Sequence, residues 1–125
     1  MTANATFAVI DDSSMDRFIA RRMLGKAHPG CEVIEFSYAE EAVSYLKSPS
    51  RKAIDLILID INLPRMNGFE FADSFASLYP ELKGHTRVIM VSHSINPADL
   101  ARAKAHPAID SYKTKPLTPG ILDVV

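Results

Sequence analysis

The stretch that decides the fold runs Ile54-Asp55-Leu56-Ile57-Leu58-Ile59-Asp60, and a turn-rich Pro64-Arg65-Met66-Asn67-Gly68 follows it closely. Five of the first six residues are apolar, which is typical of a strand buried on both faces of a sheet. A buried helix segment would look similar, but the short run, its isoleucines and the nearby proline favour a strand. We therefore predict a central strand over Ile54–Ile59, with Asp60 at its carboxyl end.

Four other short apolar or β-branched runs accompany this strand, and amphipathic helical patterns lie between them. The runs are Phe7–Ile10, Val33–Phe36, Arg87–Val91 and Ile109–Tyr112. Strand-sized runs that alternate with helices predict βαβ units, and hence an α/β protein with a parallel sheet covered by helices on both faces.

Helix caps and apolar stripes support this alternation. We expect Ser13 or Ser14 to cap a helix to about Leu24, with Met15, Ile19 and Met23 on one face and Gly25 at its end. Further helix signals, in chain order, are a capping box at Ser37-Tyr38-Ala39-Glu40, a stripe of Phe71, Phe75 and Leu78 stopped by Pro80, and caps before proline at Asn96-Pro97 and Thr118-Pro119.

Length and composition exclude several classes of protein. A chain of 125 residues without an evident linker predicts one domain over residues 1–125. The net charge of −1 argues against a bulk electrostatic grip on nucleic acid or on an anionic membrane. The single Cys31 excludes an internal disulfide, and no secretory signal or membrane-length apolar segment is visible. We expect a cytoplasmic domain that neither binds nucleic acid directly nor inserts into a membrane.

Chemically active side chains follow the ends of the predicted strands. Asp11-Asp12 follow the first run, Asp60 the third and Ser92 the fourth, and Lys115 lies just beyond the fifth. The carboxyl ends of parallel strands share one edge of the sheet, and ligands bind there. The sequence therefore predicts one pocket that holds three carboxylates, a hydroxyl and an ammonium.

This combination predicts metal-assisted phosphoryl chemistry. Clustered carboxylates repel one another unless a cation joins them, and an oxygen-only site suits Mg²⁺. Asp60 is the candidate nucleophile, since an aspartate that attacks phosphorus gives an aspartyl phosphate. Lys115 and the metal would neutralise the transferring phosphoryl oxygens, and Ser92 would donate a hydrogen bond to one of them.

The chain resembles the receiver domain of bacterial two-component response regulators, of which the single-domain chemotaxis response regulator is the minimal example. The residues that carry the resemblance are Asp11-Asp12, the run from Asp55 to Glu70 around Asp60, Ser92, Tyr112 and Lys115-Pro116. The resemblance covers essentially the whole chain, in the expected order.

The resemblance implies a flavodoxin-like three-layer sandwich, with a five-stranded parallel sheet in the order 2-1-3-4-5. Only ten residues follow Lys115, and Gly120 weakens the helix that Thr118-Pro119 would start. We therefore expect the fifth helix to be short or truncated.

The same resemblance implies the roles of the site residues. Asp60 would accept a phosphoryl group from a sensor histidine kinase or a histidine phosphotransfer protein. Asp12 and Asp60 would bind Mg²⁺ (or Mn²⁺) directly, Asp11 would act through water, and the backbone carbonyl of Asn62 would be a further ligand. The domain would be no conventional enzyme, although it would catalyse its own phosphorylation and dephosphorylation.

The family also implies a switch. Ser92 and Tyr112 match its switch pair, in which the hydroxyl moves toward the phosphoryl group and the ring turns inward, so that a protein-binding face changes. The downstream protein partner is not encoded in any residue pattern. The Lys115–Pro116 peptide bond is expected to be cis.

Two positions beside the site depart from a plain match. His93 follows Ser92 where the family usually has a small residue; either its ring faces the solvent, or it narrows access to the site and alters the phosphoryl lifetime. Ser94 and Asn62 occupy positions that tune hydrolysis in this family, and neither predicts a rate.

Four functions compete for this pattern. The first is a stand-alone receiver, and the second is the regulatory domain of a longer, DNA-binding transcription regulator, supplied without its effector. A phosphatase with an Asp nucleophile would need an acid or base two residues after Asp60, where Asn62 stands, and a cap domain for which there is no room. A flavodoxin-like FMN carrier would need a phosphate-binding loop where this chain has Asp11-Asp12, whose charges repel a phosphate.

Overall fold

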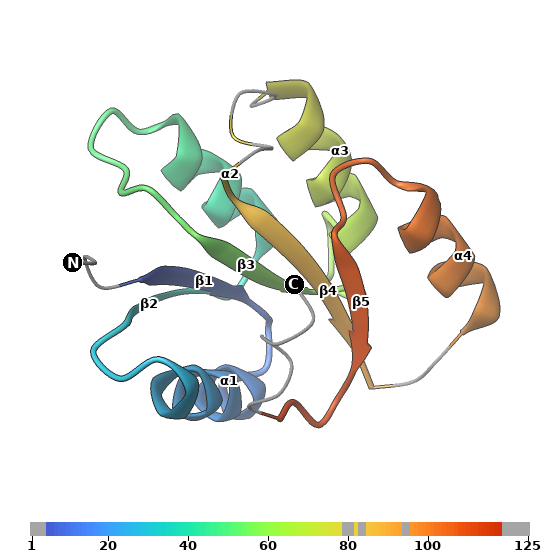
Figure 1. Ribbon diagram of the computed structural model, residues 1–125. Coiled ribbons are helices and arrows are strands. Elements are labelled where there is room, and N and C mark those ends of the chain that lie inside the picture. Colours follow the sequence, from blue (N-terminus) through green and yellow to red (C-terminus); the bar gives the residue numbers. More distant parts are fainter. Residues whose placement is uncertain (1–4, 79–81, 83–84, 94–95, 119–125) are drawn as a thin grey trace.

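The structure is a computed structural model that describes residues 5–78, 82, 85–93 and 96–118. Strands and α-helices alternate along these residues, which confirms the predicted βαβ organisation (Figure 1). In chain order the elements are β1 (Thr6–Ile10), α1 (Ser14–Ala27), β2 (Glu32–Phe36), α2 (Ala39–Lys47), β3 (Leu56–Asp60), α3 (Gly68–Leu78), β4 (Arg87–Ser92), α4 (Pro97–Ala105) and β5 (Ser111–Thr114).

The five strands form one sheet in the order β2-β1-β3-β4-β5, and every neighbouring pair is parallel. The central strand β3 is buried along its whole length, as its apolar sequence predicts. Because all strands run the same way, their carboxyl ends meet at one edge of the sheet. The predicted fold class and strand order are therefore confirmed.

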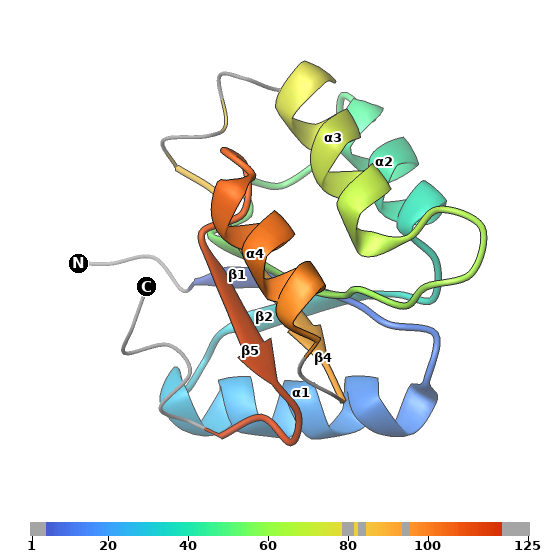
Figure 2. The same cartoon turned by 90° about the vertical axis from the view of Figure 1, so that its right-hand side faces the viewer.

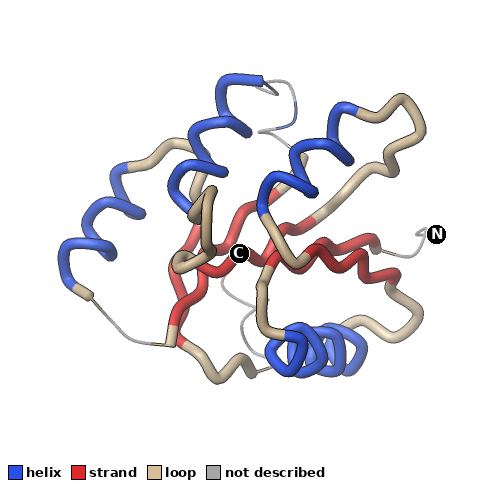
Figure 3. The backbone as a smooth tube through the Cα atoms, turned by 180° about the vertical axis from the view of Figure 1, so that it is seen from behind, coloured by secondary structure: helices blue, strands red, loops and turns tan. Residues whose placement is uncertain are grey.

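The helices divide between the two faces of the sheet (Figure 2). Helix α1 lies against one face, and α2, α3 and α4 lie against the other, an arrangement that is also visible from behind (Figure 3). Successive residues along each strand point to opposite faces of the sheet and pack into two hydrophobic cores, one on each face. The α1 side buries Phe7, Val9, Leu56, Leu58, Ile89 and Val91, and the other side buries Ala8, Ile10, Ile57, Ile59, Val88 and Met90.

Three strands match the expected bounds to within one residue, and β3 and β5 begin two residues later than expected. Strand β3 begins at Leu56 instead of Ile54, because the Asp55 carboxylate accepts the Thr6 backbone N–H at 2.9 Å and ends the ladder there. Strand β5 begins at Ser111 instead of Ile109: the Ile109 N–H bonds to the His106 carbonyl in a turn, and Ile109 fills the core from that turn.

Helix α1 also differs from its prediction. Ser13 is its N-cap, as expected, but the helix continues past Gly25 to Ala27. Met15 and Ile19 are exposed and only Met23 of the predicted face is buried, because the helix contacts the sheet through Ala20, Met23 and Leu24.

The remaining helix signals are largely confirmed. Asn96 caps α4, with Pro97 at the first helical position, while the capping box of α2 uses Glu41 where Glu40 was expected. Phe71 and Phe75 are buried in α3, and Leu78 is exposed. Pro80, Ser94, the cap at Thr118-Pro119 and the expected fifth helix lie wholly or partly outside the described residues.

Candidate phosphorylation site

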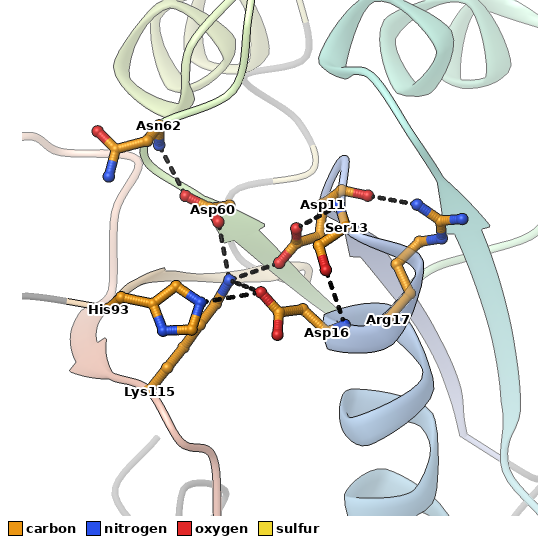
Figure 4. A network of polar contacts seen from close by, with 8 residues as sticks. All are labelled: Asp11, Ser13, Asp16, Arg17, Asp60, Asn62, His93 and Lys115. Atoms are coloured by element: carbon orange, nitrogen blue, oxygen red, sulfur yellow. Dashed lines mark hydrogen bonds and ion pairs between the residues drawn. The ribbon is translucent and has the colours of Figure 1, made fainter.

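Three predicted residues meet at the carboxyl edge of the sheet. Asp11 follows β1 directly, Asp60 is the last residue of β3, and Lys115 follows β5 (Figure 4). The Lys115 backbone N–H donates to the Ser92 carbonyl at 2.7 Å, which places the lysine beside the end of β4. The Lys115–Pro116 peptide bond is cis, as the resemblance implies, and Pro116 is exposed.

The Lys115 ammonium is the centre of the site. Its Nζ donates to an Asp11 carboxylate oxygen at 2.6 Å, to one of Asp60 at 2.8 Å and to one of Asp16 at 2.9 Å. Its side chain is only 5% exposed, so these contacts form away from bulk water. A buried ammonium with charged partners on three elements fixes the ends of β1, β3 and β5 relative to α1.

Backbone amides hold the two strand-end carboxylates in place. The second Asp60 oxygen accepts the Asn62 N–H at 2.7 Å, and the second Asp11 oxygen accepts the Ser13 N–H at 2.9 Å. Each carboxylate thus has one oxygen on a loop amide and the other on Lys115. This arrangement presents both groups to the same small volume.

Asp16 is a site residue that the sequence reasoning missed. It lies in the first turn of α1, whose N-cap Ser13 accepts the Asp16 N–H at 3.1 Å. The helix starts directly after the β1 loop, so this turn returns to the sheet edge. The pattern Ser13-Ser14-Met15-Asp16, a cap followed three residues later by an acid, was the signal available in the sequence.

The electrostatics of the site follow from burial and from these contacts. Burial raises the pKa of the Asp11 carboxyl, although hydrogen bonds from Lys115 and the Ser13 amide oppose the rise. Burial alone would raise the pKa of Asp16, but hydrogen bonds from Lys115 and His93 outweigh it and hold that pKa below its usual range. Burial acts to lower the pKa of Lys115, whereas its three carboxylate partners raise it, and the partners prevail.

An apolar cavity adjoins the charged groups. It is lined by Val9, Ile19, Ala20, Leu58, Val91 and Leu117, with Asp16, His93 and Lys115 also in its wall. Apolar walls lower the local dielectric constant and so strengthen the ion pairs beside them.

The acidic pair after β1 is divided by the structure. Asp11 is buried in the site, whereas Asp12 is exposed. Among the described residues, the carboxylates whose oxygens lie within 4.8 Å of one another are Asp11, Asp16 and Asp60. The direct-ligand role expected for Asp12 stays a prediction, as does that of the Asn62 carbonyl.

The expected switch and flanking residues lie on the neighbouring strands. Ser92 is buried at the end of β4, and Tyr112 is half-buried on β5, where it packs against the core on the α4 side. The His93 imidazole contacts an Asp16 carboxylate oxygen at 3.0 Å, although 69% of its side chain is exposed. Its ring is therefore tied to the site.

The donor set fits a hard divalent cation. Three carboxylates with oxygens within 4.8 Å supply only oxygen ligands, which Mg²⁺ and Mn²⁺ prefer. Lys115 neutralises part of their charge, and the remaining negative charge favours a cation. Asp11 and Asp60 would hold it, and it would supply charge neutralisation for phosphoryl oxygens.

Comparisons with known proteins agree with this geometry. The family model for the response regulator receiver domain matches residues 7–123 of the chain. The chain is 33% identical over 116 residues to the sensor histidine kinase CheAY of Helicobacter pylori, and 32% identical over 115 residues to the nitrate/nitrite response regulator protein NarL of Escherichia coli. These matches cover 93% and 92% of this chain, but only 14% and 50% of the two relatives.

A solved structure shows the same fold. The two component response regulator from Cytophaga hutchinsonii superposes with a TM-score of 0.88 at 29% identity, covering 98% of this chain and 93% of that one. Among the described helices, none has both the length and the apolar character that crossing a membrane requires. The match over residues 7–123, together with the fold, shows that the chain belongs to the response regulator receiver domain family.

Proposed function

We propose that this receiver domain accepts a phosphoryl group on Asp60 from a phosphohistidine of a sensor histidine kinase or a histidine phosphotransfer protein. The observation that carries the proposal is the buried Asp60 carboxylate, with one oxygen 2.8 Å from the Lys115 ammonium and the other on the Asn62 amide. The site is assembled at the edge of the sheet, where a donor can approach it.

In the transfer step, an Asp60 carboxylate oxygen attacks phosphorus and forms a new O–P bond. The P–N bond of the donor breaks, and the imidazole nitrogen keeps its electron pair. The Lys115 ammonium neutralises charge on the transferred oxygens, because it already lies beside the attacking group. Hydrolysis by water later regenerates the carboxylate, so the domain would catalyse both its own phosphorylation and its own dephosphorylation.

Mg²⁺ or Mn²⁺, when bound, would supply further neutralisation of the phosphoryl oxygens. On the geometry, Asp11 and Asp60 are the proposed ligands, because a loop amide holds one oxygen of each carboxylate and the other oxygen of each lies at the Lys115 ammonium. The resemblance implies a different set, in which Asp12, Asp60 and the Asn62 carbonyl bind the metal directly and Asp11 acts through water.

The proposed readout is a change in a protein-binding face. Ser92 is buried beside the Lys115 backbone, and Tyr112 on β5 packs against the core on the α4 side of the sheet. A phosphoryl group on Asp60 would draw the Ser92 hydroxyl and leave space for the Tyr112 ring. We propose that the domain acts alone in the cytoplasm on a downstream protein.

A second arrangement has support from the comparisons. The NarL relative is twice the length of the matched region, so a receiver of this kind forms half of a longer regulator there. The alternative is therefore a regulatory domain joined to a DNA-binding effector. Sequencing the native gene beyond the codon for Val125 decides between the two arrangements.

The experiment for the phosphorylation proposal uses a small phosphodonor and Mg²⁺. Incubation should give a base-labile phosphoryl adduct in the parent protein and none in Asp60→Asn. Asp73→Asn is the matched control, because Asp73 is an exposed carboxylate on α3, and it should label like the parent. Equal labelling of Asp60→Asn and the parent would overturn the assignment of the nucleophile.

A further inference from the structure

The three N–H donors of an ammonium are all engaged at Lys115. Asp11, Asp60 and Asp16 accept them at 2.6, 2.8 and 2.9 Å. A phosphoryl oxygen on Asp60 would need one of these donors. The Asp60 oxygen loses its charge when it is esterified and gives up its donor to one phosphoryl oxygen, so a second phosphoryl oxygen that contacts Lys115 needs a donor now held by Asp11 or Asp16.

Asp16 is the carboxylate best placed to yield. Its side chain is 18% exposed, against 5% for Asp11 and 10% for Asp60. Asp11 and Asp60 are also held by the Ser13 and Asn62 amides, whereas the Asp16 oxygen that faces Lys115 has only side-chain partners among the contacts described above. Asp16 can turn toward water without breaking a backbone hydrogen bond of its carboxylate.

The same Asp16 oxygen also contacts His93. The His93 Nε2 lies 3.0 Å from it, so this oxygen joins the first turn of α1 to the residue that follows β4 (Figure 4). Lys115 contacts it from the β5 side at 2.9 Å. One carboxylate therefore links three segments around the mouth of the site.

We propose that Asp16 is a positioning residue that holds the Lys115 ammonium and the His93 ring while Asp60 is unphosphorylated, and releases both when Asp60 carries a phosphoryl group. The proposal rests on the proposed function of Asp60. Phosphorylation replaces the single negative charge of the Asp60 carboxylate by close to two on the phosphoryl group, so the modified residue repels the Asp16 carboxylate more strongly and competes for the same ammonium.

Removing the Asp16 charge should therefore favour the phosphorylated arrangement. Asp16→Asn keeps the shape of the side chain without its charge, and Asp16→Glu keeps the charge with a longer reach. The measurements are the affinity for beryllofluoride, a phosphoryl analogue, and the rate of phosphorylation by a small phosphodonor. Both are made at a Mg²⁺ concentration that saturates each variant, so that any change in metal affinity is separated from the result.

We expect Asp16→Asn to bind beryllofluoride about fivefold more tightly and to be phosphorylated about fivefold faster, since one like charge beside the incoming anion is lost. Asp16→Glu should stay within about twofold of the parent, because charge and hydrogen bonding are retained. If Asp16 had a purely structural role, both substitutions would weaken beryllofluoride binding and slow phosphorylation.

Nuclear magnetic resonance of the histidine rings gives an independent readout. The His93 signals, assigned by their loss in His93→Gln, should move on addition of beryllofluoride to the parent. In Asp16→Asn they should already lie near the final position and move little. His85, which contacts Asp55 at the far end of β3, serves as the internal control and should not move in either protein.

Two results would overturn the inference. Unchanged or weaker beryllofluoride binding in Asp16→Asn would show that Asp16 does not compete for Lys115. A static His93 signal in the parent would show that phosphorylation does not release the ring. If the parent itself is not phosphorylated, or Asp60→Asn is, the proposed function fails; if only the Asp16 variants disagree, the failure belongs to this inference.

Discussion

Replacing Lys115 by Met removes the ammonium that holds three carboxylates together. The carboxylate oxygens of Asp11, Asp16 and Asp60 lie within 4.8 Å of one another. At an effective dielectric constant of about 20, two unit charges at that separation repel by about 3.5 kcal/mol. In the parent protein, the contacts of Lys115 at 2.6 to 2.9 Å offset this repulsion.

The expected loss of stability in Lys115→Met is smaller than the summed repulsion of the three carboxylate pairs. Asp16 is the most exposed of the carboxylates and can turn to water, which leaves one repelling pair, Asp11 and Asp60. Lys115→Met should therefore lower the free energy of unfolding by about 3–4 kcal/mol at pH 7, within the range found when one partner of a buried ion pair is removed.

The loss of stability in Lys115→Met should become smaller as the pH is lowered. Protonating a carboxyl group of ordinary pKa costs about 4 kcal/mol at pH 7 but only about 1.5 kcal/mol at pH 5. The variant can then relieve its repulsion by taking up a proton, so the loss at pH 5 should fall to about 1–2 kcal/mol. The raised pKa of Lys115 contributes nothing to this difference, because its stabilisation is complete below pH 10 and is lost only as pH rises through the folded value.

The assay is urea denaturation followed by circular dichroism, with a chelator present to exclude metal. Lys104→Met, which removes an exposed lysine of α4, is the control and should cost less than about 0.5 kcal/mol. Added Mg²⁺ should recover much of the loss in Lys115→Met, because a metal bound only to the folded site would take the place of the ammonium between the carboxylates. A loss below about 1 kcal/mol, equal at both pH values, would show that Lys115 does not offset a repulsion between these carboxylates.

Four further substitutions test other parts of the structure. Gly68→Ala should destabilise the protein by about 1–2 kcal/mol in urea denaturation, because the new Cβ would lie 3.0 Å from the Asp60 carbonyl oxygen. Gly25→Ala should stabilise the protein by about 0.5–1 kcal/mol, because a Cβ at this position of α1 enters open space. A change of the same sign in both variants would contradict these surroundings of the two glycines. Glu35→Gln should lower the free energy of unfolding by at most about 1 kcal/mol at pH 7. Burial acts to raise the pKa of Glu35, but hydrogen bonds from two arginines of α1 lower it, so the stabilisation is present above the ordinary pKa of 4.5 and is lost as pH falls through the folded pKa. An equal cost at pH 7 and pH 3 would contradict this. His93→Ala should change the rate of phosphoryl loss from Asp60 several-fold if the ring narrows access to the site, and an unchanged rate would reject that role.

Much of the fold was predictable because its signals are local. The buried run that ends at Asp60 can form only a few structures, and the alternation of such runs with capped helices specifies a parallel sheet. Strand ends then bring Asp11, Asp60 and Lys115 to one edge, whatever the details of the loops. Chain order alone was therefore enough to predict that these three residues meet.

The predictions were wrong or incomplete where contacts between distant parts of the chain determine the structure. Asp16 is separated from Lys115 by 99 positions, and its role depends on how the first turn of α1 returns to the sheet edge. Ile109 is apolar because it fills the core from a turn, so its hydrophobicity was mistaken for the start of β5. Gly25 ends no helix, because the packing of Met23 and Leu24 against the sheet carries α1 past it.

Locating the phosphoryl group is the most direct test that Asp60 is the nucleophile. After phosphorylation with a small donor and Mg²⁺, borohydride reduces an acyl phosphate to the corresponding alcohol, and mass spectrometry of the peptides identifies the residue that has changed. We expect homoserine at position 60 and an unmodified Asp60 when the donor is omitted. Reduction at Asp11, Asp12 or Asp16 with Asp60 intact would contradict this expectation.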